Sequence, residues 1–79
     1  MFINKARDGL NNICGRKIAI KRKDMGLSQK KLSDNLQLLG LDIDKNAIQR
    51  IECGKRFVTD IELKFIARAL DMSYEDLLD

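Results

Sequence analysis

The stretch Asp44-Lys-Asn-Ala-Ile-Gln-Arg-Ile-Glu-Cys-Gly54 decides how the rest of this sequence is interpreted. Placed on one short helix at about 100° per residue, it separates into two chemically distinct faces. The apolar face consists of Ala47, Ile48 and Ile51 and suits burial against a core. The opposite face carries two cations and two amides, whose donors and acceptors match base edges in the major groove of DNA. Its residues are Lys45, Asn46, Gln49 and Arg50.

Capping residues mark the ends of this helix and the start of the one before it. Asp44 can accept hydrogen bonds from N–H groups of the first turn, and Gly54 can end the helix in the left-handed conformation. Upstream, Ser28 is a suitable N-cap, and Leu32 and Leu36 follow it at helical spacing. The sequence therefore predicts two helices joined by a turn, with the polar face on the second.

Three segments share a pattern with one known family: Leu27-Ser28-Gln29, Ile48-x-x-Ile51-Glu52-x-Gly54-Lys55-Arg56 and Ala67-x-Ala69-Leu70. Through them the chain resembles the phage-repressor helix-turn-helix family of the Cro and lambda-repressor type, also called XRE, over residues 15–78. The resemblance implies an all-α lambda-repressor-like domain whose recognition helix enters the major groove.

The connection inside the motif departs from the usual family pattern. Leu36 and Ile48 lie twelve residues apart, with Gln-Leu-Leu-Gly-Leu-Asp-Ile between them, which is more than the usual turn allows. A branch of the family carries a similar insertion. We therefore expect the family fold with a lengthened turn, in which Leu41 and Ile43 contact the core.

Length and composition indicate a small soluble domain. Its 79 residues allow one domain that buries only about 60% of the surface of its unfolded chain, which leaves no room for a deep active-site cleft. No apolar run approaches the ~18 residues of a membrane span, and the first residues lack the apolar core of a signal peptide. We expect a cytoplasmic protein without membrane contact.

The sequence offers no reactive cluster. Histidine is absent, and Cys14 and Cys53 fall in separate predicted helices without the paired spacing of a zinc site. Without a nucleophile, base or metal cluster, we expect no enzyme activity, no metal, no cofactor and no small-molecule substrate.

Charge is distributed unevenly along the chain. Residues 1–57 hold 13 Lys or Arg against 6 Asp or Glu, a balance of +7, whereas residues 58–79 hold 2 against 6, a balance of −4. A basic front with an acidic back is expected of a protein that docks one side on a polyanion. The plain alternative is a solvated charged surface with no such task.

The pattern along the chain predicts an arm followed by five helices. Residues 1–10 lack periodicity and are interpreted as an N-terminal arm, and residues 11–79 as the helix-turn-helix domain. The first helix is predicted from about Asn12 to about Met25, before Gly26. Its inner side is expected to consist of Ile13, Cys14, Ile18 and Met25.

The remaining helices follow from their caps and apolar stripes. The second is predicted over 29–39, with Leu32, Leu36 and Leu39 facing inward. Thr59 and Glu62 form a capping-box pattern that opens a fourth helix to about residue 70, and residues 73–76 open a short fifth. The core stripe of the fourth helix is Leu63, Ile66, Ala67 and Leu70.

Candidate site residues divide into three groups. Base contacts are expected from the polar face, where the two amides suit adenine and the two cations suit guanine; the alternative is an exposed face with no task. Phosphate contacts are expected from Ser28, Gln29, Gly54, Lys55 and Arg56. The resemblance also implies an ion pair between Arg22 and Glu52, expected to be partly exposed and worth about 1 kcal/mol or less.

The sequence therefore predicts a sequence-specific, double-stranded DNA-binding transcriptional regulator, a repressor that acts as a homodimer. The alternative is an antitoxin or another regulatory module whose helix-turn-helix binds a protein. Ile61 and Phe65 lie off the core stripe, and they either pack under the arm or the fifth helix or contribute to the dimer surface. Further candidates for that surface are Tyr74, Leu77 and Leu78.

Overall fold

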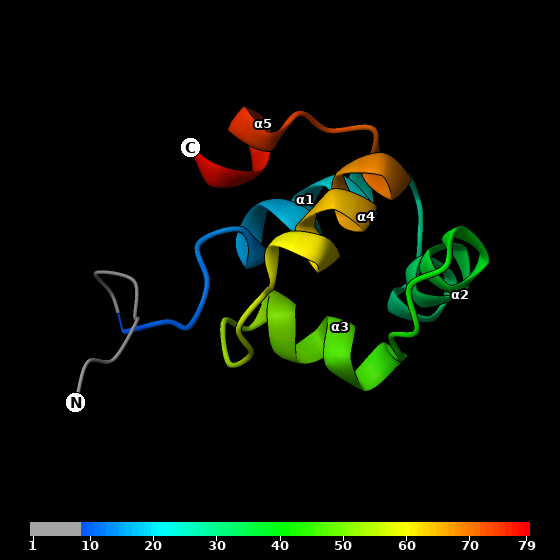
Figure 1. The fold of residues 1–79 in the computed structure, drawn as a ribbon, viewed down its shortest axis with the longest axis horizontal. Coiled ribbons are helices and arrows are strands. Elements are labelled where there is room, and N and C mark those ends of the chain that lie inside the picture. The colour runs from blue at the N-terminus through cyan, green and yellow to red at the C-terminus, as the bar shows by residue number, and fades with distance from the viewer. Residues whose placement is uncertain (1–8) are drawn as a thin grey trace.

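The computed structural model describes residues 9–79, and within them the chain forms five α-helices and no strand. The expected all-α fold is confirmed (Figure 1). Expectations for residues 1–8 of the arm lie outside the described residues. The helices are α1 (Gly15–Asp24), α2 (Gln29–Leu39), α3 (Lys45–Glu52), α4 (Asp60–Leu70) and α5 (Tyr74–Leu78).

Side-chain caps open α2 to α5 at the expected residues. Ser28, Asp44, Thr59 and Ser73 each accept a hydrogen bond from a backbone N–H in the first turn that follows. Thr59 and Ser73 form complete capping boxes, because Glu62 and Asp76 bond back to the cap N–H groups. These local signals, which depend on only four consecutive residues, were sufficient to predict where these four helices begin.

The first helix starts later than expected, at Gly15. The side-chain oxygen of Asn12 accepts a hydrogen bond from the Gly15 N–H at 2.8 Å, so Asn12 lies before the helix and closes its open end. Cys14 and Ile18 are buried as expected, but Ile13 and Met25 are exposed. They were assigned to the core on the assumption that the helix extends over both of them.

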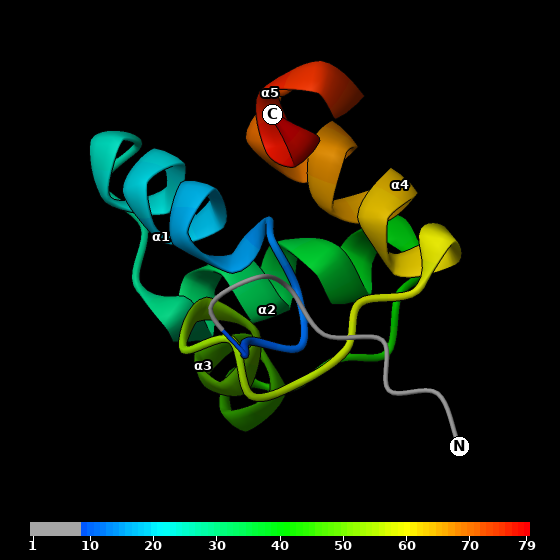
Figure 2. The same cartoon turned by 90° about the vertical axis from the view of Figure 1, so that its left-hand side faces the viewer.

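The core lies where α1, α2, α3 and α4 meet, with α5 closing one side (Figure 2). The predicted inward position of Leu39 is wrong: it lies in the last turn of α2 and is exposed, whereas Ser33 is buried and bonds to the Lys30 carbonyl. The buried hydrophobic residues are Cys14, Ile18, Leu32, Leu36, Ile43, Ile48, Ile51, Ile66, Ala67, Leu70 and Leu77.

The lengthened turn between α2 and α3 is anchored at three points. Gly40 ends α2 with φ 109°, and the Leu41 N–H returns to the Leu36 carbonyl at 2.9 Å. Ile43 is buried in the core, and the Gln37 side-chain amide donates to the Ile43 carbonyl at 3.0 Å. The turn therefore gives α3 a defined starting point.

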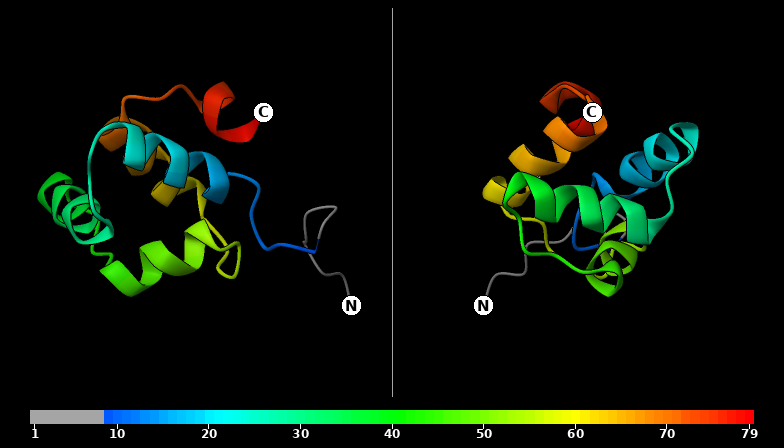
Figure 3. Two further views of the ribbon diagram at one scale, coloured as in Figure 1. Left: turned by 180° about the vertical axis from the view of Figure 1, so that it is seen from behind. Right: turned by 90° about the vertical axis from the view of Figure 1, so that its right-hand side faces the viewer.

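The arrangement leaves one side of α3 uncovered. α3 and α5 lie at opposite sides of the molecule, with α1 and α4 between them (Figures 1 and 3). The acidic C-terminal helix is thus remote from the cationic face of α3. Among the described helices, none has the length and apolar character that crossing a bilayer requires.

Candidate nucleic-acid interface

The outward face of α3 consists of side chains without internal partners. Lys45, Asn46, Gln49 and Arg50 are all exposed. Within residues 9–79, the structure gives none of these four side chains a hydrogen bond or ion pair. Their donors and acceptors are therefore available to an external ligand.

The opposite face and both ends of α3 are fixed. Ile48 and Ile51 are buried in the core. At the start, the Asp44 carboxylate accepts from the Ala47 N–H at 2.8 Å. At the end, Gly54 has φ 77°, and the N–H of the next residue, Lys55, bonds back to the Arg50 carbonyl at 2.9 Å. A helix held in this way presents its polar side chains in one orientation.

A buried charge network connects the first three helices. The Arg22 guanidinium, on α1, bonds to both carboxylate oxygens of Glu52, on α3, at 2.7 and 3.1 Å. It also donates to the Leu27 carbonyl at 2.7 Å. The two side chains are only 10% and 7% exposed. The expectation of a partly exposed pair is wrong: the pair lies where α1 packs against α3, with bonds to the Leu27 carbonyl and the Gln29 amide, and no sequence pattern indicates this burial.

Gln29 is the third member of that network. Its side-chain amide donates to a Glu52 oxygen at 3.0 Å, while Ser28 caps α2 through the Lys31 N–H. One N–H of the Gln29 amide is thus committed, and its other N–H stays available for an anion near the N-terminus of α2. Phosphate contact by Ser28 and Gln29 stays a prediction. The bond to Glu52 fixes the orientation of the Gln29 side chain.

The residues that follow α3 differ in what they can offer to DNA. Lys55 is exposed, and its ammonium has no partner within residues 9–79. Gly54 is buried, and its N–H donates to the Ile51 carbonyl, so this N–H is not available for a phosphate. Arg56 bonds to both carboxylate oxygens of Glu62, at 2.9 and 2.6 Å. Of the two cations, Arg56 is paired with Glu62, whereas Lys55 has no ion-pair partner within residues 9–79.

The Glu62 carboxylate both forms an ion pair with Arg56 and completes the capping box of α4. It accepts from Arg56 and from the Thr59 N–H at 3.0 Å. The Arg56 guanidinium holds the pKa of this carboxyl below its ordinary 4.5; burial opposes the shift, and the Thr59 N–H adds to it. Because the folded state binds this proton less tightly, the pair stabilises the fold above pH 4.5 and loses its effect as the pH falls through the lowered pKa.

Replacing Glu62 by Gln should lower the stability at neutral pH by about 1 kcal/mol, as expected for a partly exposed pair and one cap. It should also reduce the decline in stability when the pH falls below 4.5. Urea unfolding at a series of pH values measures both effects. Asp60→Asn is the control, because it removes a carboxylate from the same helix end without breaking the Arg56 pair. Equal pH profiles for Glu62→Gln and the parent would contradict the assignment.

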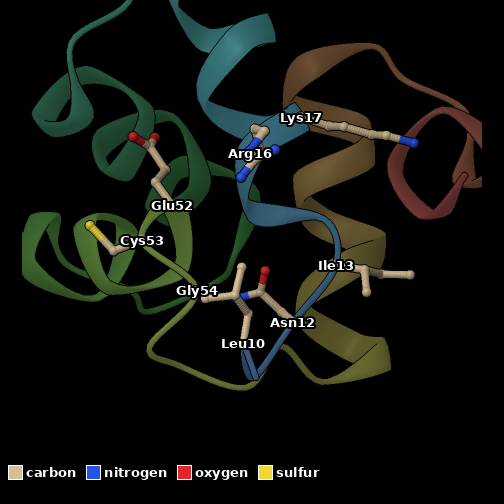
Figure 4. Close-up of a pocket in the computed structure, with 8 residues that line it drawn as sticks. All are labelled: Leu10, Asn12, Ile13, Arg16, Lys17, Glu52, Cys53 and Gly54. Carbon is tan, nitrogen blue, oxygen red and sulfur yellow. The ribbon is translucent and has the colours of Figure 1, made fainter. Parts of the chain in front are cut away.

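Asn11 and Asn12 lie at the site although no motif in the sequence points to them. Both donate to backbone carbonyls at the end of α3 or in the loop that follows. Asn12 lines a cleft between α1 and the end of α3, together with Arg16 and Cys53 (Figure 4). The only sequence signal was a pair of asparagines directly before a helix.

The described residues contain no group of three His, Cys, Asp or Glu side chains that could hold a metal ion. The two cysteines are unpaired and differ in environment: Cys53 is exposed, whereas Cys14 is buried. Burial raises the pKa of the Cys14 thiol, which keeps it protonated and unreactive.

Together, a five-helix fold, an unpaired polar face on a rigid helix and a preceding capped helix define a helix-turn-helix DNA-binding protein. The Helix-turn-helix family model matches residues 18–77, and the chain belongs to this family, as a DNA-binding transcription regulator of the XRE type.

One solved structure supports the assignment. The restriction-modification controller protein C.AhdI from Aeromonas hydrophila matches with a TM-score of 0.70 and 26% sequence identity. The match covers 81% of this chain and 86% of that chain. Comparison with curated proteins finds no match.

Proposed function

We propose that this protein represses transcription by binding a specific double-stranded DNA sequence as a homodimer. The observation that carries the proposal is the outward face of α3, where Lys45, Asn46, Gln49 and Arg50 are exposed and unpaired within residues 9–79. Two amides and two cations on a fixed helix are suited to reading base edges in the major groove.

Backbone contacts would flank this helix on both sides. Ser28 and Gln29 lie at the start of α2, and Lys55 follows α3. Arg56 can add a further contact if its guanidinium binds a phosphate while it is bonded to Glu62. Contacts of this kind set the register of a protein on the duplex and contribute most of the salt dependence.

Repression in this proposal follows from occupancy. A protein that occupies promoter DNA excludes polymerase from it, so no catalytic step is needed. The controller protein C.AhdI, which has the same fold, is described as a restriction-modification controller. This supports a controller role for the present chain, which we propose it exerts by binding operator DNA.

The proposed dimer surface is the outer side of α4 with the start of α5. Ile61 is 66% exposed, so it does not pack under α5, and Tyr74 is exposed as well. The cations Lys64 and Arg68 line both shallow clefts along this side, one with Ile61 and Phe65 and one with Tyr74. In a two-fold dimer, these cations could meet the acidic α5 of the second copy.

One residue proposed for the dimer surface is excluded. Leu77 is 0% exposed and belongs to the core, where it holds α5 on α1 and α4. Its place in the proposed surface rested on an apolar side chain that the fifth helix leaves to bury, and the core of the same chain buries it. Leu78, its neighbour, is exposed and stays a candidate.

Selection of bound sequences from a random duplex pool, followed by sedimentation of the complex, tests this proposal. We expect an inverted repeat with half-sites about one helical turn, ~34 Å, apart and two protomers per duplex. Ile61→Gln should weaken pairing of the protomers, whereas Leu38→Gln, at an exposed leucine on α2, should not. One protomer per saturated duplex, without symmetry in the selected site, would contradict the dimer.

A further inference from the structure

The short segment Leu10–Asn12, here called the clasp, crosses the end of α3 and the loop that follows it. The Asn11 N–H donates to the Gly54 carbonyl at 2.8 Å, and the Asn11 side chain donates to the Lys55 carbonyl at 3.0 Å. Leu10 lies directly on Gly54, where an added Cβ would approach the Leu10 side chain to 2.8 Å. Figure 4 shows Leu10 and Asn12 of the clasp beside Gly54.

Asn12 makes the most extensive contacts in the clasp. Its side-chain N–H groups donate to the Ile51 carbonyl at 3.0 Å and to the Arg56 carbonyl at 2.7 Å. Its side-chain oxygen accepts from the Gly15 N–H at 2.8 Å. One carboxamide therefore joins the start of α1, the last turn of α3 and the loop after it, using both donors and its acceptor.

The clasp bonds to carbonyl groups at the end of α3 and in the loop that follows. The Ile51 carbonyl, in the last turn of α3, accepts from both the Gly54 N–H and the Asn12 side chain. The carbonyls of Gly54, Lys55 and Arg56, which lie beyond the helix, accept from Asn11 or Asn12. Carbonyl oxygens held in this way cannot turn toward a DNA phosphate, which they would repel.

We propose that Asn12 is a positioning residue for DNA backbone binding, an inference that rests on the proposed function. It acts through the loop at residues 54–56: by holding the carbonyls on either side of Lys55, it fixes the direction in which the Lys55 ammonium projects. Asn11 supports the same loop with its single side-chain bond to the Lys55 carbonyl. Base reading belongs to α3, so the clasp should affect affinity rather than sequence preference.

Asn12 also accepts from the first N–H of α1, so it could serve only as a cap of that helix. Substitutions can distinguish this capping role from the positioning role. Asn12→Ser retains an oxygen that can accept from the Gly15 N–H but removes the amide nitrogen whose two N–H groups reach the Ile51 and Arg56 carbonyls. Asn11→Ala removes the exposed bond to the Lys55 carbonyl together with the Asn11 side-chain oxygen, which is buried without a hydrogen-bond partner within residues 9–79. It leaves the Asn12 bonds and the Asn11 N–H bond to the Gly54 carbonyl in place. Met72→Ala is the stability control, because Met72 packs against the core outside this region.

The experiment measures the affinity of the whole protein for the selected duplex and for an unrelated duplex over a range of salt concentrations. For Asn12→Ser we expect weaker binding to both duplexes and a slope of log K against log[salt] that is smaller by about 0.9, the value for one phosphate contact. Asn11→Ala should weaken binding to both duplexes about twofold to tenfold, as for one hydrogen bond. Hydrogen exchange at Gly54 and Lys55 should accelerate in both variants, and Met72→Ala should leave the slope unchanged.

The possible failures can be distinguished. A wild-type slope near zero would overturn the proposed DNA binding and this role together. A steep wild-type slope that stays the same in Asn12→Ser would overturn the positioning role alone and leave Asn12 as a cap of α1. If Asn12→Ser does not fold, Asn11→Ala decides: unchanged affinity and unchanged exchange at Gly54 and Lys55 would overturn the clasp.

Discussion

Replacing Glu52 by Ala should destabilise the domain by about 3–5 kcal/mol, the range for breaking a buried ion pair. The Arg22 guanidinium would retain its bond to the Leu27 carbonyl but lose both bonds to the carboxylate. Its side chain is only 10% exposed, so water replaces little of the lost interaction. Gln29 would lose its partner as well. Urea unfolding at neutral pH measures the change.

A second ion pair in the same protein is the matched control. Lys30 and Asp34 lie one turn apart on α2 with a separation of 2.8 Å, but their side chains are 68% and 42% exposed. Asp34→Ala should therefore cost about 0.5 kcal/mol or less. The double variant Arg22→Met, Glu52→Leu should regain much of the lost stability, because it leaves no buried charge unpaired. Equal effects of Glu52→Ala and Asp34→Ala would contradict the burial of the first pair.

Replacing Gly15 by Ala should destabilise the protein, although this change in a helix ordinarily stabilises it by up to about 1 kcal/mol. A Cβ on Gly15 would overlap the Ile51 carbonyl oxygen and lie 2.8 Å from the side-chain oxygen of Asn12. Both are fixed, because the first belongs to the backbone of α3 and the second bonds to the Gly15 N–H. The start of α1 must therefore move away from the end of α3, at a cost of at least about 1–3 kcal/mol.

Gly26→Ala separates this overlap from backbone strain. Gly26 has φ 72°, and an added Cβ there would meet nothing within 4 Å. Its replacement should cost only the left-handed conformation, about 1–2 kcal/mol. Gly15→Ala should in addition weaken DNA binding, because it displaces the last turn of α3, whereas Gly26→Ala should not. Unfolding and duplex-binding measurements on both variants test this, and a Gly15→Ala protein as stable as the parent would contradict the close approach.

The parts of this fold that depend on neighbours in sequence could be predicted. The caps at Ser28, Asp44 and Thr59 need only a side chain and an N–H three residues later. The burial of Ile48 and Ile51 follows from helical spacing alone. The same pattern showed which side of α3 would stay exposed.

The parts that depend on distant segments could not be predicted from residue types. The bond between Arg56 and Glu62 was not predicted. Residue types alone assign Arg56 to a phosphate contact and Glu62 to the capping box of α4, and neither role indicates that the two side chains meet. Asn12 reaches carbonyls of residues 39 and 44 positions away, and backbone acceptors leave no trace in a sequence. Leu39 and Met25 were predicted to face the core but are exposed. Helical spacing places them in line with buried residues, but the core does not reach the ends of their helices.

If the face of α3 reads bases while Lys55, just after it, binds the DNA backbone, then Arg50→Ala and Lys55→Ala should affect binding in different ways. Both variants would be titrated at several salt concentrations on the selected operator, its single-base variants and unrelated DNA. Arg50→Ala should cost about 1–3 kcal/mol at one base pair and relax selectivity there, whereas Lys55→Ala should weaken binding to every duplex alike and reduce the salt slope by about one. Uniform weakening by Arg50→Ala together with an altered base preference in Lys55→Ala would contradict the assignment of α3 as the recognition helix.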